Sequence, residues 1–259
     1  MTKKLNIAII QANLKWEDAK ENRSFFSREI DALSDNVELI VLPEMFTTGF
    51  SMNAKALAEE TNGETFLWMK EMAKRKDAAI TGSVIITENG NYYNRLFFMF
   101  PDGSYKIYDK RHTFTLAKED LTYTAGVERL IVDYKGWRIC PLVCYDLRFP
   151  VFSRNTEDYD ILIYVANWPK KRIVAWDTLS KARAIENMSY VISVNRTGKD
   201  GNGAEYNGHS AVYDYLGECI TEPEREESFV QELALEKEAL INARNKFKFL
   251  QDRDEFSLK

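Results

Sequence analysis

The sequence predicts one α/β domain with a mixed sheet, or a pair of sheets, and helices outside. Short and almost wholly apolar runs, such as 37–42, alternate with amphipathic helical patterns early in the chain, as expected of strands that are covered on both faces. Asn89-Gly90 and Lys135-Gly136 separate extended runs in the middle of the chain, which indicates hairpins. No repeat or Pro/Ser-rich linker divides the 259 residues, so we expect a single domain over 1–259 with its core at about 5–235.

Periodicity places the elements along the chain. A buried strand over 5–10 leads to a helix over 17–33, whose apolar side chains fall near one face. The other expected strands are 37–42, 78–86, 93–100, 105–108, 137–143, 160–166, 190–195 and 229–233, with a hairpin made by 209–214 and 218–222. The other expected helices are 64–76, 171–187 and the charged C-terminal helix 235–249, and 198–208 is expected to be a glycine-rich loop.

Composition excludes several classes of function. A net charge of −5 with scattered Lys and Arg argues against a nucleic-acid groove or an anionic membrane surface. No apolar window approaches the ~20 residues of a membrane span, and the N-terminus lacks the long apolar segment of a signal peptide. Three cysteines and two histidines, with no clustered spacing, predict neither a disulfide scaffold nor a metal site. We therefore expect a cytoplasmic protein with free thiols, and this composition is compatible with small polar substrates.

Three reactive side chains each follow a predicted buried strand. These are Glu44, Lys110 and Cys144. Because ligands bind at strand ends in α/β folds, we expect the three to converge on one site. Cys144 would be the nucleophile, and Glu44 would take the thiol proton and deliver it to a leaving amine. Lys110 would favour the thiolate and, with the backbone N–H of Tyr145, would stabilise a tetrahedral oxyanion.

Other residues near these strand ends have alternative interpretations. Glu119 is placed to hold Lys110 charged, although the adjacent Asp120 could do the same. Arg148 is a candidate for binding substrate or for a structural ion pair, and Trp168 is a candidate pocket wall or packing residue.

The remaining reactive residues are assigned no catalytic role. Cys140 and Cys219 are expected to be structural. A cysteine–histidine mechanism would need His112 or His209 beside Cys144, and the carboxylate of Glu44 already supplies a base.

Several short motifs contain Glu44, Lys110 and Cys144 or lie further along the chain. They are Leu-Pro-Glu (42–44), Asp-Lys-Arg-His (109–112), Cys-Tyr-Asp-Leu-Arg-Phe-Pro (144–150), Asn-Trp-Pro (167–169), Ala-Arg-Ala-Ile-Glu-Asn (182–187), Val-Asn-Arg (194–196), Asp-Gly-Asn-Gly (200–203) and the following Tyr206. Together they resemble the motifs of the nitrilase superfamily of carbon–nitrogen hydrolases, and of its omega-amidase branch in particular. The resemblance places a Glu–Lys–Cys triad on Glu44, Lys110 and Cys144, and the family's second glutamate on Glu119. Branch members often have Gly-Glu where this chain has Lys118-Glu119.

The resemblance also implies a fold and a reaction. The fold is a four-layer α-β-β-α sandwich, usually dimerised, without a metal or organic cofactor. The reaction is hydrolysis of the terminal amide of 2-oxo acids, such as 2-oxoglutaramate and 2-oxosuccinamate, through a thioester acyl-enzyme that releases ammonia. The alternatives are another linear amide, an N-carbamoyl compound, or a non-catalytic member of this fold that acts in binding or assembly.

Overall fold

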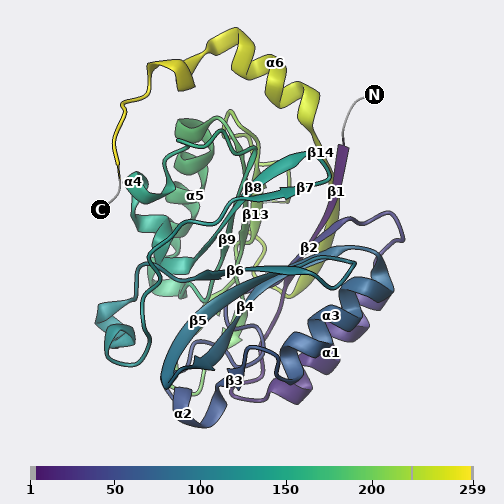
Figure 1. The fold of residues 1–259 in the computed structure, drawn as a ribbon, viewed down its shortest axis with the longest axis vertical. Helices are drawn as coiled ribbons and strands as arrows, with labels where there is room; N and C mark the ends of the chain where they lie inside the picture. The colour runs from purple at the N-terminus through teal and green to yellow at the C-terminus, as the bar shows by residue number, and fades with distance from the viewer. Residues whose placement is uncertain (1–3, 223, 258–259) are drawn as a thin grey trace.

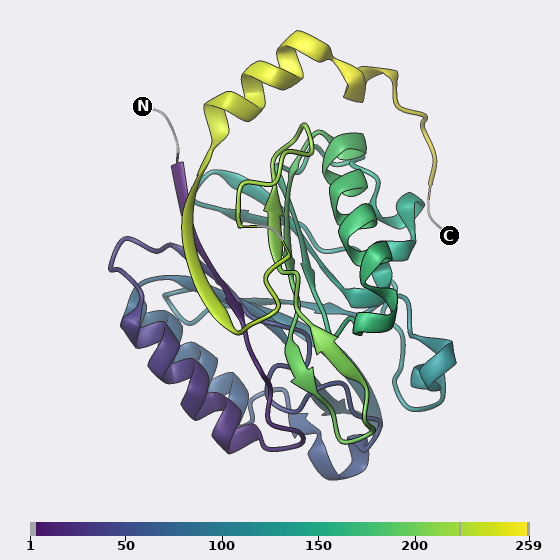
Figure 2. The same cartoon turned by 180° about the vertical axis from the view of Figure 1, so that it is seen from behind.

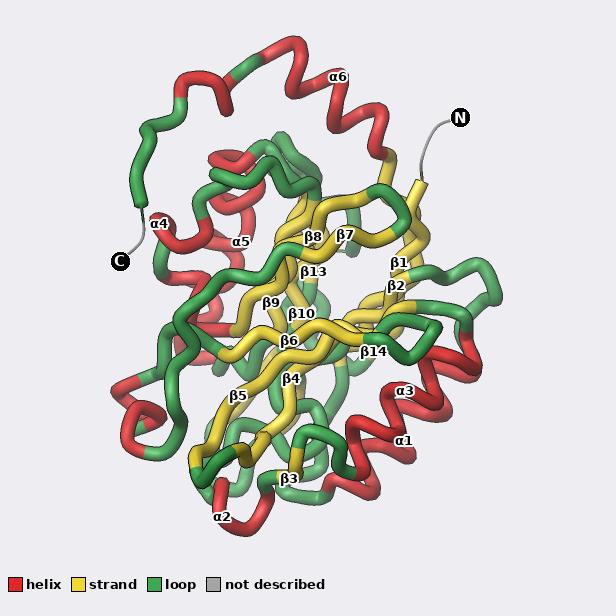
Figure 3. Tube along the Cα trace, viewed as in Figure 1, coloured by secondary structure: helices red, strands yellow, loops and turns green. Residues whose placement is uncertain are grey.

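The computed structural model describes residues 4–222 and 224–257, and it shows two mixed β-sheets between layers of helices (Figure 1). Helices α1 (Ala19–Ala32) and α3 (Glu64–Lys76) lie on one side, and α4 (Pro150–Ser153) and α5 (Ile173–Asn187) lie on the other. The view from behind shows α1 and α5 on opposite sides of the strands (Figure 2), and the helices stay outside the strands in Figure 3. The predicted α-β-β-α sandwich of two mixed sheets is confirmed.

The first sheet has seven strands. In spatial order they are β14 (Phe229–Glu236), β1 (Lys4–Gln11), β2 (Leu39–Val41), β4 (Ala79–Glu88), β5 (Asn91–Met99) and β6 (Tyr105–Asp109), with the short β3 (Glu59–Glu60) beside β4. β1, β2 and β4 run parallel to one another. β14 pairs antiparallel with β1, β5 with β4, and β6 with β5. Asn89 and Gly90 link β4 to β5 with φ of 50° and 76°, as a two-residue hairpin turn requires.

The second sheet has five strands. In order they are β13 (Ala211–Tyr213), β10 (Tyr190–Val194), β9 (Ile161–Val165), β8 (Trp137–Val143) and β7 (Val132–Tyr134). The three central strands run parallel, and the two outer strands are antiparallel to them. Both sheets therefore have a parallel centre, and the carboxyl ends of these central strands can carry a site.

Both faces of the first sheet are covered, which explains its apolar runs. Ile7 and Ile9 of β1 belong to the core between the sheets, together with Ile161 and Ile163 of β9. The alternate side chains of β1, such as Ile10, pack under α1 and α3. Since successive residues of a strand point to opposite faces, two cores require an unbroken apolar strand.

Three expectations about local structure need correction. Residues 198–208 are not a loop throughout, because β11 (Thr197–Lys199) and β12 (Glu205–Asn207) pair as an antiparallel hairpin. The second arm of the hairpin expected at 209–222 is reduced to a single bridge between Tyr213 and Cys219. The first helix begins at Ala19, since Asp18 accepts a hydrogen bond from the Glu21 N–H (3.0 Å) and caps it.

The C-terminal segment leaves the sandwich after β14. α6 (Lys237–Phe247) continues from that strand and arches over the end of the molecule (Figure 2). Arg244 ties α6 to the body, because its side chain donates hydrogen bonds to the carbonyl oxygens of Met188 (2.7 Å) and Tyr159 (2.6 Å). A short α2 (Ala54–Leu57) follows the loop after β2. Within the described part of the chain, no helix is long and apolar enough to cross a membrane.

Candidate active site

Strand ends from both sheets bring the predicted reactive groups together. Glu44 follows β2 after two residues and Lys110 directly follows β6, both in the first sheet, whereas Cys144 directly follows β8 in the second. Lys110 Nζ lies 3.0 Å from Glu44 Oε1. Lys110 and Cys144 line the same cavity. The sequence-predicted set is therefore assembled across the interface between the sheets.

The Glu44 carboxylate is fully buried and held at both oxygens. Oε1 accepts hydrogen bonds from Lys110 Nζ (3.0 Å) and from Asn94 Nδ2 (2.8 Å). Oε2 accepts one from the backbone N–H of Asn167 (2.8 Å). These donors offset the loss of water around a buried charge and fix the carboxylate in one orientation.

Lys110 lies between two carboxylates. Its Nζ is 2.9 Å from both oxygens of Glu119, in addition to its bond to Glu44. Burial lowers the pKa of Lys110, but Glu119, Glu44 and Cys144 raise it more, so the lysine stays charged. Burial also raises the pKa of the Glu119 carboxyl, against the opposing charge of Lys110. Glu119 is buried and in contact while Asp120 is exposed, so Glu119 is the residue that holds Lys110.

Cys144 occupies a strained turn. Its φ is +47°, a left-handed conformation that a non-glycine residue adopts only when its surroundings impose it. The thiol is 9% exposed. Burial, then the negative charge of Glu44 and a hydrogen bond to it, raise the pKa of Cys144 well above its ordinary value, although Lys110 opposes them. Lys110 favours the thiolate, as its charge predicts, but burial and Glu44 outweigh it, so the thiol lies protonated beside a carboxylate that can accept its proton.

Asp146 fixes this turn, and the sequence did not single it out. Its carboxylate is fully buried. Oδ2 accepts hydrogen bonds from the Val143 N–H (2.9 Å) and the Tyr108 hydroxyl (2.7 Å). Oδ1 accepts a hydrogen bond from the backbone N–H of His112 (3.0 Å) and lies 2.7 Å from Nδ1 of the same residue's ring. One carboxylate therefore joins the turn that carries Cys144 to the segment that carries Lys110.

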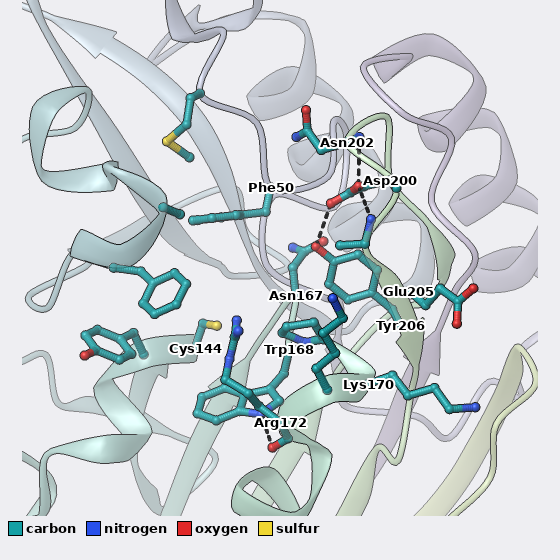
Figure 4. A pocket seen from close by; sticks show the side chains of 18 of the residues that line it. Phe50, Cys144, Asn167, Trp168, Lys170, Arg172, Asp200, Asn202, Glu205 and Tyr206 are labelled. Atoms are coloured by element: carbon teal, nitrogen blue, oxygen red, sulfur yellow. Dashed lines mark hydrogen bonds between the residues drawn. The ribbon is translucent and has the colours of Figure 1, made fainter.

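A cavity of about 780 Å³ opens above Cys144 (Figure 4). Its lining combines aromatic, cationic and amide side chains. It includes Phe50, Met52, Lys110, Phe114, Ala117, Cys144, Tyr145, Arg148, Asn167, Trp168, Lys170, Lys171, Arg172, Asp200, Asn202, Glu205 and Tyr206. Tyr145 lies in the 3₁₀ turn Cys144–Arg148, so its backbone is next to the thiol. The size suits a small ligand, and the polar groups can fix its orientation.

Two arginines face the cavity on aromatic supports. The Arg148 guanidinium lies 4.9 Å from the centre of the Trp168 ring, and that of Arg172 lies 4.9 Å from the Phe114 ring. Neither forms an ion pair with a carboxylate among residues 4–222 and 224–257. Trp168 both lines the cavity and packs on Trp176, at a ring distance of 5.6 Å. Trp168 is therefore both part of the cavity wall and a packing residue.

Two further segments line the cavity, namely residues 170–172 and the β11–β12 hairpin. Lys170 and Lys171 are exposed, and together with Arg172 they line the cavity. The β11–β12 hairpin contributes Asp200 and Tyr206, which are joined by a 2.9 Å hydrogen bond. The available sequence signal was the basic run 170–172, because it follows β9, the neighbour of the strand that leads to Cys144.

The other histidine and cysteines lie away from the thiol. His209 pairs with Asp177 (3.1 Å). Cys140 is buried inside β8, and Cys219 is half-buried near Thr221. In the described ranges, no three His, Cys, Asp or Glu side chains are grouped so that they could hold a metal ion.

This fold and this arrangement define a class of enzyme. A protonated thiol next to a buried carboxylate and a charged lysine is suited to acyl transfer from an amide. The chain belongs to the carbon–nitrogen hydrolase family, whose model matches residues 6–244. It is an amide-hydrolysing enzyme.

Individual relatives cover almost the whole chain. The omega-amidase YafV of Escherichia coli (strain K12) is 45% identical over 98% of each chain. The 2-oxoglutaramate amidase of Bacillus subtilis (strain 168) is 34% identical, over 92% of this chain and 94% of that protein. The crystal structure of XC1258 from Xanthomonas campestris, a CN-hydrolase superfamily protein with an arsenic adduct in its active site, matches with a TM-score of 0.97 at 44% identity, covering 99% of this chain and all of that one.

Proposed function

We propose that this enzyme is an omega-amidase that hydrolyses the terminal amide of small 2-oxo acids, such as 2-oxoglutaramate and 2-oxosuccinamate. The observation that carries the proposal is a thiol facing a small cavity in which Arg148 and Arg172 have no carboxylate partner among the described residues. Such guanidinium groups suit a substrate carboxylate, which can take two parallel hydrogen bonds from one fork. Relatives named omega-amidase and 2-oxoglutaramate amidase support the same substrate class.

The first half of the reaction forms an acyl-enzyme. Cys144 Sγ attacks the amide carbon while its proton passes to Glu44. Lys110 and the Tyr145 N–H stabilise the negative oxygen of the tetrahedral intermediate, and each contributes roughly 3 kcal/mol. Glu44 then returns the proton to the nitrogen, the carbon–nitrogen bond breaks, and ammonia leaves a thioester on Cys144.

The second half uses the same carboxylate. Glu44 takes a proton from a water molecule that attacks the thioester carbon. The carbon–sulfur bond breaks, the proton returns to Cys144, and the dicarboxylate product leaves. Glu119 takes no part in bond making in this scheme, since both its oxygens are engaged by Lys110. It holds the lysine in place.

An ammonia-release assay tests the substrate class. We expect the two 2-oxo acid amides to be hydrolysed faster than glutamine, asparagine, N-carbamoyl amino acids and the uncharged amide propionamide. Arg148→Gln and Arg172→Gln should raise KM for the 2-oxo acid amides on the order of 10-fold, since a hydrogen bond to a charged group contributes about 1.5–3 kcal/mol. Arg28→Gln, on the exposed face of α1, is the matched control and should leave KM unchanged.

The alternatives predict different outcomes of this assay. Fastest release from an N-carbamoyl amino acid, or equal rates with propionamide, would replace the 2-oxo acid proposal with one of the other amide classes. Absence of ammonia from every compound would favour a binding or assembly role for the chain.

We also propose that the enzyme works in the cytoplasm as a homodimer. Its three free cysteines support a reducing compartment. Large apolar side chains are exposed on α5 and on the C-terminal segment, among them Val174 (75%) and Phe249 (55%), as a surface that meets a second copy would have. Light scattering should give twice the chain mass of 30.1 kDa, and Phe249→Glu should weaken the association. A monomer at micromolar concentration would contradict the proposal.

A further inference from the structure

Within residues 4–222 and 224–257, Asn94 is the one neutral side chain that hydrogen-bonds both glutamates of the site. It lies in the middle of β5, where its side chain is 1% exposed. Its Nδ2 donates to Glu44 Oε1 (2.8 Å) and to Glu119 Oε1 (3.3 Å). Its backbone carbonyl accepts the N–H of Lys110 (3.0 Å). One residue thus contacts the whole carboxylate–lysine–carboxylate group.

The orientation of this amide is fixed by its neighbours. A rotation that exchanged Oδ1 and Nδ2 would point a carbonyl oxygen at two carboxylates, which is repulsive. In the observed orientation, Asn94 Oδ1 is buried without a hydrogen-bond partner. Leaving a buried acceptor unpaired destabilises a folded protein. An apolar residue would avoid that loss, so the amide is retained here for its donors.

We propose that Asn94 is a positioning residue that keeps the carboxylates of Glu44 and Glu119 charged and correctly spaced around Lys110. This inference rests on the proposed role of Glu44 as the base. Two carboxylates that share one lysine repel each other. A neutral amide that donates to both reduces this repulsion without adding a second positive charge that would compete with Lys110.

The same contacts select the oxygen that receives the proton. Glu44 Oε1 is occupied by Lys110 and Asn94, whereas among the described residues Oε2 accepts a hydrogen bond from the Asn167 N–H alone. Oε2 therefore has a lone pair free for the Cys144 proton. If Asn94 is lost, Glu44 can turn about its last torsion, and the proton acceptor is no longer held in one place.

Other charged and titratable groups also surround the carboxylates of Glu44 and Glu119 and can affect their pH dependence. Lys110 after β6 and Cys144 after β8 face Glu44 directly, and the hydroxyls of Tyr123 and Tyr206 interact with its charge from the loop after Glu119 and from β12. None of these groups supplies the donor that Asn94 supplies. Removing it makes the charged form of the carboxylate pair less stable, so the pair takes up a proton at higher pH.

The pH profile of kcat/KM for the best amide substrate tests the proposal. Asn94→Leu has a similar shape and lacks the donors. We expect its acid limb to move to higher pH by about one unit, which corresponds to a tenfold change in proton affinity. At a pH on the plateau, kcat should fall more than KM changes. Asn94→Ser keeps a donor and leaves room for water. Its acid limb should therefore lie between those of wild type and Asn94→Leu.

A matched variant separates positioning from folding. Asn155 is also buried, and its amide donates to the carbonyl oxygens of Tyr159 (2.9 Å) and Asn187 (3.0 Å) away from the carboxylates. Asn155→Leu should lower Tm and leave the position of the acid limb unchanged. Profiles that coincide for wild type, N94L and N94S would overturn the inference, as would an equal shift in N155L. A wild-type enzyme that releases no ammonia from any amide would instead contradict the proposed function, so the two failures differ.

Discussion

The two sheets contribute different chemistry to one site. The first sheet supplies a sealed charge network, in which Glu44, Lys110 and Glu119 are at most 1% exposed. The second sheet supplies the proposed nucleophile and part of the cavity wall, with Cys144 9% exposed and Trp168 lining the same cavity. The charged groups are buried from solvent, whereas the thiol faces the cavity.

This difference shows how the cysteine becomes reactive. Burial raises the pKa of Cys144, so the thiol at the end of β8 is inert without a base. In the proposed mechanism, the base that removes its proton is Glu44, which comes from the first sheet. Reactivity is therefore a property of how the two sheets pack, and either side can be altered separately.

The largest effect should come from removing the nucleophile on the second sheet. Cys144→Ala should lower kcat at least about 10⁴-fold, since loss of a nucleophile removes the covalent pathway. Far-UV circular dichroism should show an intact fold. Cys140→Val, four residues earlier in β8, is the control and should retain activity. Normal ammonia release by C144A would contradict the division of roles.

Removing the base on the first sheet should have the next largest effect. Glu44→Gln keeps the shape of the side chain and loses its ability to take a proton, so kcat should fall about 10²- to 10⁴-fold. Glu38→Gln changes a carboxylate that hydrogen-bonds the Asn6 N–H outside the site, and should have little effect on kcat. If the thiol needed no base, E44Q would lose little kcat in the ammonia-release assay, and that result would contradict the role of Glu44.

Loosening the joint between the two sheets should have an intermediate effect. Asp146→Asn removes a charged acceptor that joins Val143, Tyr108 and His112, so we expect kcat to fall about 10-fold and unfolding free energy to fall by about 1–3 kcal/mol. Asp160→Asn removes a similarly buried carboxylate bonded to Lys237 and Arg244 near α6. Urea unfolding should show both losses of stability, while kcat should fall only in D146N.

A change at Cys140 should leave catalysis unchanged and affect the stability of the second sheet at alkaline pH. Burial raises the pKa of Cys140 from 9.0 to about 12. Its stabilising contribution is complete below pH 9 and is lost as pH rises toward 12, because the unfolded thiol loses its proton first. One such group lowers the unfolding free energy by about 1.4 kcal/mol per pH unit in this window. Denaturant titrations at several pH values give the unfolding free energy as a function of pH. Between pH 9 and 12 this free energy should fall less steeply in C140V than in wild type, by that amount per pH unit. Equal pH dependence in the two proteins would contradict the assignment.

Much of the fold could be predicted because strands and turns have local signals. The apolar run before Glu44 and the Asn89-Gly90 pair each determine their structure within a few residues. The hairpin of β11 and β12 could not, since its strands are three residues long and its glycines are typical of loops. The stacking of two sheets depends on contacts between distant segments, and family resemblance was needed to expect it.

The site divides in the same way. Glu44, Lys110 and Cys144 were predictable because each follows a buried strand. Asn94 was not, because a polar residue in a strand normally indicates an exposed face. The choice between Glu119 and Asp120 needed coordinates, since neighbouring residues of a 3₁₀ turn point in different directions. Where the 170–172 run lies relative to Cys144 is also a tertiary property.

Mass spectrometry of the enzyme quenched during turnover of 2-oxoglutaramate tests the central claim most directly. The account predicts an acyl adduct, equal to substrate minus ammonia, on the peptide that contains both Cys140 and Cys144, with fragmentation placing it at Cys144. C140V should carry the same adduct and C144A should carry none. Full ammonia release by C144A, or an adduct that forms on another residue, would contradict a thioester at the junction of the two sheets.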